Sequence, residues 1–297
     1  MRDHQSVLIN ETLEALSIKK GETYIDATLN GGGHAGEILK RDGRVFGIDI
    51  DPEAIKKAAK AFSLKLSDEE GRLFGKNDLI AIAQSNFSDL KQTAFKFGVW
   101  ETPGVLFDLG LSSLQLDNPE RGLSFSKEGP IDMRLDPTLQ VTAADLINGL
   151  SQGELNELFF NYGEEHASRS IARAIVKARL REKIRTTTQL VKIIEQVVRG
   201  RGKIHPATKI FQALRITVNN ELENLEKGLE GAEDLLKKGG RLVVISFHSL
   251  EDRVVKNYFK KRWHLTVLTK KPIVPGRDEI LNNPRSRSAK MRVAQRV

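Results

Sequence analysis

Short apolar runs alternate with helical patterns along residues 23–108, and this alternation limits the possible folds more than any other feature of the chain. Four runs have the length and composition of buried strands: 23–27, 44–49, 79–83 and 105–108. Residues with helical spacing separate them, at 35–40, 51–62 and 88–97. Strands separated by helices pair in parallel through right-handed crossovers. The sequence therefore predicts an α/β fold with a parallel sheet.

The alternation stops after Asp108 and resumes near residue 207. Between these points the chain is first rich in turn residues, over 111–140, and then has only helical spacing, over 142–200. Further elements are expected at 207–237 (helix), 241–247 (strand), 250–262 (helix), 265–269 (strand) and 291–294 (strand). The sequence thus predicts a discontinuous α/β domain, residues 1–110 and 210–297. A helical domain of residues 111–209 is inserted in it, and we expect this domain to recognise the substrate.

Positive charge is concentrated in two segments of the chain. The 297 residues include 47 Lys and Arg against 39 Asp and Glu, a net charge of +8. Residues 169–203 and 251–297 each carry +9, so the remainder carries −10. In the first segment four cations recur every fourth residue: Arg169, Arg173, Lys177 and Arg181. Such zones are typical of surfaces that bind phosphate, although a solvated helix face and a basic tail explain the charge equally well.

Several classes of protein are excluded or disfavoured by composition. The chain has no cysteine, which removes disulfides, thiol catalysis and Cys-ligated zinc, and its six histidines form no H-x-x-x-H pair, so we expect no metal. The proportions of hydrophobic (39%) and charged (29%) residues are those of a globular protein. No apolar segment is long enough for a membrane span and residues 1–6 lack a leader pattern, so we expect a cytoplasmic protein without a membrane partner.

A glycine-rich turn follows the first predicted strand. Gly31, Gly33 and Gly36 satisfy G-x-G-x-x-G, a pattern in which the backbone approaches a ligand closely at the start of a helix, although a tight turn without a ligand gives the same pattern. Asp49 ends the next strand, where an acidic residue binds ribose hydroxyls in dinucleotide sites. The two features predict an adenosine-type ligand, and NAD and S-adenosylmethionine both satisfy them.

Two further aspartates favour S-adenosylmethionine. Asp26 ends the first strand and Asp108 ends the fourth. Carboxylates repel the pyrophosphate of NAD, whereas S-adenosylmethionine carries a sulfonium and an ammonium and no phosphate. A simple cap on the turn is the alternative for Asp26. An NAD-dependent oxidoreductase stays a rival interpretation, but it leaves Asp26 and the basic segments unexplained.

Long motifs distributed along nearly the whole chain have a recognisable order and spacing. They are Asp26–His34, Gly47–Pro52, Asp108–Asp117, Glu120–Phe125, Gly129–Arg134, His205–Thr208, Phe211–Ile216, Ser246–Arg253 and Asn283–Ser288. Together they resemble the bacterial 16S ribosomal RNA (cytosine-N4)-methyltransferase family of the MraW type. Leu114, where a proline is common, and Asn30, before the triple glycine, are small departures that remove no functional group from a cofactor contact.

The resemblance implies a class I, Rossmann-like methyltransferase sheet with an inserted helical domain. It implies S-adenosylmethionine as cofactor and, as substrate, a cytidine in the decoding centre of 16S rRNA, in the small subunit or a late assembly particle. It leaves open a homodimer and a ribosome-assembly factor that binds RNA without catalysis. The family's cofactor contacts fall on Gly32, Gly33, His34, Asp49, Phe87, Asp108 and Gln115.

The expected reaction is attack of the cytosine amino nitrogen on the methyl group of the cofactor. Asp108 is the candidate acceptor for that amino group, with Asp132 and residues 246–248 as candidate walls. His34 is expected to contact backbone or cofactor rather than to act as a base, whereas His248 fits a site wall and a packed core histidine equally well. The proposed RNA contacts are Arg169, Arg173, Lys177, Arg181, Arg285 and Arg287, together with Lys290 and Arg292.

Overall fold

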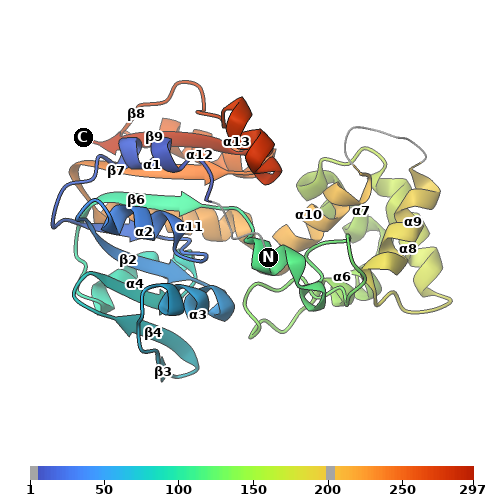
Figure 1. Cartoon of the computed structure of the whole chain (residues 1–297). Coiled ribbons are helices and arrows are strands. Elements are labelled where there is room, and N and C mark those ends of the chain that lie inside the picture. The colour runs from blue at the N-terminus through green and yellow to red at the C-terminus, as the bar shows by residue number, and fades with distance from the viewer. Residues whose placement is uncertain (1–5, 199–204) are drawn as a thin grey trace. The chain divides into compact units, whose positions relative to one another are not determined.

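The computed structural model describes residues 6–198 and 205–297. They divide into two compact units (Figure 1). Unit 1 contains the described residues up to Gly110 together with Leu222–Val297, and unit 2 contains Leu111–Glu221. The second boundary therefore lies at Leu222 rather than at the predicted residue 210, because residue 210 falls inside a helix, Ala207–Asn219, whose apolar side chains are buried in the core of unit 2.

Unit 1 is built on a nine-stranded sheet with the order β3-β4-β5-β2-β1-β6-β7-β9-β8. Its strands are β1 (Thr23–Asp26), β2 (Arg44–Asp49), β3 (Ser67–Glu69), β4 (Arg72–Lys76), β5 (Ile80–Gln84), β6 (Thr102–Asp108), β7 (Leu236–Ser246), β8 (Leu265–Val267) and β9 (Lys290–Arg296). The central strands β5, β2, β1, β6 and β7 are parallel, and the outer strands are antiparallel. The predicted α/β fold class is thus confirmed.

Helices cover both faces of this sheet, because successive strand residues point to opposite sides. Tyr24, Val45 and Leu106 pack in one cluster with α1 (Ile9–Leu16), α2 (Gly33–Leu39) and α3 (Pro52–Ala61). Their neighbours Ile25, Phe46 and Phe107 pack on the other face with α4 (Leu90–Lys96), α11 (Glu221–Leu235) and α12 (Ser249–Lys261). Figure 1 shows α1, α2 and α3 on the near side of the strands. The remaining short elements are η1 (Phe87–Asp89), α13 (Arg277–Asn282) and η3 (Pro284–Ser288).

Unit 2 is helical, as its spacing predicts. Its elements are α5 (Ser113–Asp117), η2 (Pro119–Arg121), α6 (Ala143–Gly149), α7 (Gln152–Gly163), α8 (Ser168–Arg179), α9 (Thr187–Val197) and α10 (Ala207–Asn219). Capping boxes at Thr142, Ser151 and Thr186 start α6, α7 and α9, because each side chain accepts from the third residue of its helix. The apolar faces of α6–α10 form a core of their own.

Several elements differ from expectation. The helix predicted over 207–237 is two helices, because Asn220 adopts a left-handed conformation (φ 48°) between α10 and α11. The second of these helices, α11, ends at Leu235 rather than at the predicted Lys237, and strand β7 begins at the next residue. The hairpin of β3 and β4, and helices α1 and α13, have no counterpart in the prediction. No helix within residues 6–198 or 205–297 combines the length and apolarity that crossing a membrane requires.

Candidate active site

Three aspartates lie at the carboxyl edge of the central strands. Asp26, Asp49 and Asp108 are the last residues of β1, β2 and β6. Because β1 pairs in parallel with both β2 and β6, and Asp26 lies opposite Gly47 and Leu106, the three strand ends meet at one edge of the sheet. All three side chains are buried, with exposures of 1%, 8% and 4%. The sequence prediction of clustered carboxylates at this edge agrees with this arrangement.

Burial determines the protonation of two of these carboxyls. It raises the pKa of Asp26 to about 7, with a further rise from the nearby Asp49 and a partial decrease from the Thr28 backbone N–H. It raises the pKa of Asp108 to about 8, where Asp26 and Glu251 add to the rise and the Gly110 backbone N–H opposes it. Asp108 Oδ1 has no hydrogen-bond partner among the described residues. A positively charged ligand would favour the ionised form of both carboxyls and offset the cost of burying their charge.

Asp49 connects the glycine-rich turn to the start of α3. Its Oδ2 accepts from the Asn30 backbone N–H at 2.8 Å, and its Oδ1 accepts from the Asp51 backbone N–H at 2.9 Å. A carboxylate oxygen accepts more than one hydrogen bond, so both oxygens retain capacity for ligand hydroxyls. The geometry accommodates the ribose-binding role predicted for Asp49 and also gives this residue a structural function.

Packing within the protein accounts for the glycines of the turn. A Cβ on Gly32, which has φ +83°, would lie 2.5 Å from the Phe62 ring, and a Cβ on Gly33 would lie 2.0 Å from Ser6 Oγ. At Gly31 the nearest atoms belong to the flexible Lys57 side chain, at 2.9 Å. The turn thus favours glycine at 32, where φ is positive, and at 33, where a side chain would displace Ser6, before any ligand is considered. The pattern alone therefore does not identify a ligand.

His34 is held between the N-terminal segment and Asp108. Its Nε2 lies 3.0 Å from the Val7 carbonyl oxygen, which only accepts, so Nε2 carries a hydrogen. Its Nδ1 lies 3.6 Å from Asp108 Oδ2, and both side chains are about 95% buried. The Leu8 backbone N–H donates to Glu279 Oε1 on α13 at 2.8 Å, which fixes the segment in place. The contacts that residues 6–8 make with the site were not predicted, because so short a segment shows no hydrophobic periodicity.

The two remaining predicted cofactor contacts lie in different units. Phe87 begins η1 after β5 in unit 1, where its ring meets Phe107 edge to face at 5.7 Å. Gln115 is buried in α5 of unit 2, where its Oε1 accepts from the Ser112 backbone N–H at 2.9 Å. Gly32, Gly33, His34, Asp49, Phe87 and Asp108 thus share unit 1, and Gln115 belongs to unit 2.

The predicted site walls have structural partners. Asp132 binds the guanidinium of Arg134 through both oxygens, at 2.9 and 2.7 Å, which holds its pKa low. Ser246 Oγ donates to the Lys290 carbonyl at 3.3 Å. His248 is the N-cap of α12, with Nε2 3.0 Å from Glu251 Oε1 but outside hydrogen-bond geometry. His248 is therefore a capping residue rather than a core histidine.

The predicted cationic stripe lies on α8 in unit 2. Arg169, Arg173 and Lys177 are exposed on α8, and Arg181 is exposed just beyond its end. None of the four has an ionic partner in the part of the chain that the structure describes. Arg179 differs, because it donates to the carbonyls of Ile147 and Leu150 and anchors α6 to α8. Residues 199–203 of the basic segment lie outside the described residues.

The predicted phosphate contacts of the C-terminal segment separate into two pairs. Arg285 and Arg287 are exposed in η3, which precedes β9 at the carboxyl edge of β7. Arg292 is only 7% exposed and binds Asp252 through Nε at 2.6 Å and Nη2 at 3.2 Å, with Lys290 Nζ at 3.6 Å from the same carboxylate. The prediction was wrong for Arg292, because this buried side chain neutralises Asp252 inside unit 1, whereas Lys290 is partly exposed and its phosphate contact stays a prediction.

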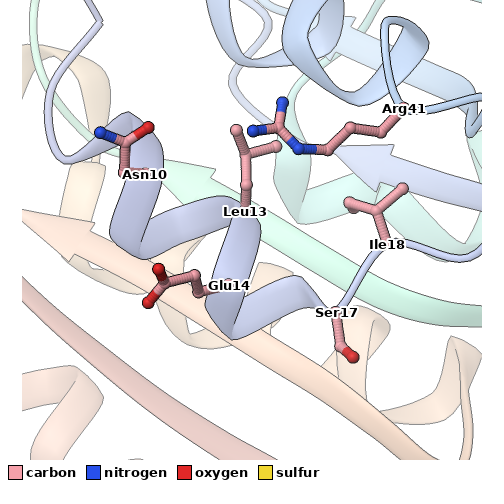
Figure 2. Close-up of a pocket in the computed structure, with 6 residues that line it drawn as sticks. All are labelled: Asn10, Leu13, Glu14, Ser17, Ile18 and Arg41. Atoms are coloured by element: carbon pink, nitrogen blue, oxygen red, sulfur yellow. The ribbon is translucent and has the colours of Figure 1, made fainter.

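A separate hollow lies beside α1 (Figure 2). It is lined by Asn10, Leu13, Glu14, Ser17, Ile18 and Arg41. Ser17 and Ile18 precede β1, and Arg41 precedes β2, so this hollow extends toward the amino edge of the parallel strands. It contains none of the predicted site residues.

A family model and curated relatives match this chain over its whole length. The model of the MraW methylase family matches residues 1–297. The chain is 46% identical to ribosomal RNA small subunit methyltransferase H of Carboxydothermus hydrogenoformans, over 99% of the chain and 98% of that protein. It is also 46% identical to the protein of the same name from Persephonella marina, over the full length of both. A crystal structure of an rRNA methylase from Streptococcus thermophilus aligns with a TM-score of 0.43 at 10% identity, over 97% of this chain and 93% of that one.

Proposed function

The chain belongs to the MraW methylase family, and from this premise we propose that it methylates the N4 amino group of one cytidine in the decoding centre of 16S rRNA. The methyl donor of the family is S-adenosylmethionine. The curated relatives are named small-subunit rRNA methyltransferases, which supports ribosomal RNA as the substrate class. The choice of cytosine N4 and of the decoding centre rests on the motif resemblance.

The observation that carries this proposal is the set of three buried carboxyls at one sheet edge. Asp26, Asp49 and Asp108 create a region where added positive charge is favourable, and Asp108 Oδ1 lacks a partner among the described residues. The donor has two positive charges and ribose hydroxyls, so the residues present fit it. Asp49 would accept from the hydroxyls, and Asp26 and Asp108 would balance the charge.

The reaction needs an acceptor for the amino group of the base. When bound, S-adenosylmethionine supplies an electrophilic methyl group on sulfur. The N4 lone pair would form a bond to the methyl carbon as the carbon–sulfur bond breaks, S-adenosylhomocysteine would leave, and the proton lost from N4 would be released to solvent. Because that lone pair is delocalised into the ring, the protein must orient N4 and accept a hydrogen bond from it. We assign this acceptor role to Asp108.

Asp108 can serve as this hydrogen-bond acceptor only when its carboxyl is ionised, and its raised pKa opposes ionisation in the free protein. With a pKa of about 8 the carboxyl is mainly protonated at pH 7 in the free protein, and a protonated carboxyl is a poor acceptor. Nearby positive charge lowers the pKa of a carboxyl and favours its ionised form. Asp108 therefore gains its full acceptor capacity when the site is loaded. His34, held by the Val7 carbonyl, limits the movement of the Asp108 side chain.

Recognition of the RNA is assigned to exposed cations. Arg169, Arg173, Lys177 and Arg181 would contact phosphates from unit 2, and Arg285 and Arg287 from η3 of unit 1. We assign substrate recognition to unit 2 on this basis, with the assembled small subunit or a late precursor as the particle recognised.

Transfer of labelled methyl groups tests the proposal. Small subunits purified from cells that lack the enzyme are incubated with it and labelled S-adenosylmethionine, and the labelled nucleoside is identified by mass spectrometry. We expect N4-methylcytidine at one position in the decoding centre. No transfer to small subunits or their precursors, or a label on another base or atom, would contradict the proposal.

A further inference from the structure

An exposed tryptophan follows helix α12 on unit 1. The indole of Trp263 is 82% exposed, the largest exposure among the large hydrophobic side chains of the described residues. The other tryptophan, Trp100, is 65% exposed and rests on Phe95, with ring centroids 4.7 Å apart. An indole so open to water loses the benefit of burial, which suggests a binding role.

A buried carboxylate supports the residue on which the Trp263 ring packs. Its ring lies against the imidazole of the next residue, His264, with centroids 3.4 Å apart. His264 Nδ1 lies 3.4 Å from Glu233 Oε1, and Glu233 also accepts a 2.6 Å hydrogen bond from the Tyr258 hydroxyl. Glu233 is 8% exposed, so this anchor is inside unit 1. Because its contact with His264 already restricts the indole ring, the ring loses little conformational entropy when a ligand stacks on its other face.

Uncompensated lysines precede the tryptophan on α12. Lys256, Lys260 and Lys261 are exposed, and none has an ionic partner within the described ranges. Arg262 differs, because it pairs with Glu230 and lies over the Tyr258 ring. Cations in the last helical turn also stabilise the helix dipole, which accounts for Lys260 and Lys261. It does not account for Lys256 or for the exposed indole.

We propose that Lys256, Lys260, Lys261 and Trp263, here called the α12 patch, bind single-stranded RNA through phosphate contacts and base stacking. Exposed lysines that precede an exposed aromatic ring by two, three and seven residues supply the two chemistries that an unpaired nucleotide needs, a cation for its phosphate and a flat surface for its base. The 13 residues of α12 span about 20 Å. The patch thus lies roughly that far from the carboxyl edge of β7, where α12 begins, and contacts RNA well away from the reacting base.

The position of the patch follows from the direction of α12. The helix starts at the carboxyl edge of the sheet and its last residues lead to β8, so Trp263 belongs to the opposite end of unit 1. This inference rests on the proposed function, since it presumes an RNA substrate much larger than one nucleoside. It adds a recognition surface to the two already proposed, the α8 stripe of unit 2 and Arg285 and Arg287 of unit 1, and this surface lies at the edge of the sheet opposite to η3.

The two tryptophans allow a direct optical test. W100F leaves Trp263 as the sole indole, and W263F leaves Trp100 as a matched control. Titration with protein-free 16S rRNA is expected to quench the emission of Trp263 and to leave that of Trp100 unchanged. W263A is expected to weaken rRNA binding roughly tenfold. Its affinity for S-adenosylmethionine should stay unchanged, which also shows that it is folded.

The lysines are tested separately from the ring. K256Q/K260Q/K261Q should reduce the slope of log affinity against log salt by about 2, as three lost phosphate contacts require. No quenching of Trp263 by rRNA, with unchanged affinity in W263A, overturns the inference. So does quenching by whole small subunits but not by protein-free rRNA, which would indicate a ribosomal protein, and so does a concentration-dependent change without RNA, which would indicate a second copy.

Methyl transfer by the W100F protein to small subunits keeps this result distinct from the proposed function. Transfer to cytidine N4 in small subunits, with no quenching of Trp263 by rRNA, would reject only the α12 patch. Quenching of Trp263 by rRNA, without transfer to small subunits or their precursors, would support the patch and reject the proposed activity.

Discussion

The charges of unit 1 and unit 2 are arranged in opposite ways. At the carboxyl edge of unit 1, Asp26 and Asp108 are buried, and burial raises their pKa values to about 7 and about 8, so both bind protons near neutral pH. On α8 of unit 2, Arg169, Arg173 and Lys177 are exposed to solvent. The charge of the first region is expected to depend on a ligand, whereas the second region presents exposed cations.

This difference determines how each region responds to solution conditions. Buried charges are little screened by salt, whereas exposed cations are screened by it. The charge of the two buried carboxyls changes with pH near neutrality. We therefore expect cofactor binding to depend on pH and RNA binding to depend on salt. Variants of the buried carboxyls should therefore alter cofactor binding, and variants of the exposed cations should alter RNA binding.

The largest effect is expected for Asp108→Asn. The amide keeps the shape but loses the negative charge and presents a donor group, so methyl transfer in a single turnover should fall about a thousandfold. Rates are measured by quenched-flow with small subunits as substrate. Asp42→Asn, an exposed position in the same unit, is the matched control. Unchanged turnover and unchanged cofactor affinity in Asp108→Asn would remove this residue from the site.

Arg292→Gln tests whether burial rather than sign of charge determines a residue's role. The substitution leaves Asp252 in unit 1 without its bidentate partner, and thermal or urea unfolding should show a loss of about 3 kcal/mol. The slope of rRNA affinity against salt should not change. Arg287→Gln, an exposed cation of the same segment, is expected to do the reverse. A stable Arg292→Gln protein with a reduced salt slope would restore Arg292 as a phosphate contact.

Neutralising the α8 stripe comes next in size. R169Q/R173Q/K177Q/R181Q should weaken rRNA binding roughly 30-fold at low salt and reduce the salt slope by about 3, measured by filter binding. The control removes the same charge from four lysines of unit 1 that have carboxylate partners: Lys20, Lys40, Lys56 and Lys227. An unchanged slope in the stripe variant would mean that α8 is only a solvated face.

The smallest effect is the pH dependence of cofactor binding. The free protein holds protons on Asp26 and Asp108, and a cationic ligand favours their loss, so affinity for S-adenosylmethionine should rise roughly tenfold from pH 6 to pH 8. Calorimetry in buffers of different ionisation enthalpy would detect the released protons. A flat profile without proton release would show that both carboxyls are already ionised.

Asp26 and Asp108 also make the free energy of unfolding depend on pH. Their pKa values in the folded protein lie above the unfolded value, so the folded state binds more protons between about pH 4 and 8. This contribution to the free energy of unfolding is fully present below pH 4 and is lost as pH rises through 7 to 8. D26N/D108N should flatten this part of the unfolding profile, measured without cofactor.

The sequence was sufficient to place the three aspartates because a local rule applies to them. Each ends an apolar run of strand length, and parallel strands share a carboxyl edge, so Asp26, Asp49 and Asp108 had to meet. The exposed face of α8 was equally predictable, because a cation at every fourth residue lies on one side of a helix.

Contacts between distant parts of the chain were not predictable in this way. Arg292 pairs with Asp252, 40 residues away, and in the sequence it is indistinguishable from the exposed Arg287. Val7 contacts His34, and the next residue, Leu8, is bound by Glu279 near the other end of the chain. The role of Gly33 likewise depends on Ser6. Such positions depend on tertiary packing, about which composition and spacing carry no information.

The separation of the two regions is the central claim, and one pair of titrations tests it most directly. Asp108→Asn and the α8 stripe variant are each titrated with S-adenosylmethionine by calorimetry and with 16S rRNA across a salt series. We expect Asp108→Asn to lose cofactor affinity while keeping its rRNA affinity and salt slope, and the stripe variant to show the opposite. If either variant loses both affinities while remaining folded, the account of two independent charge systems is contradicted.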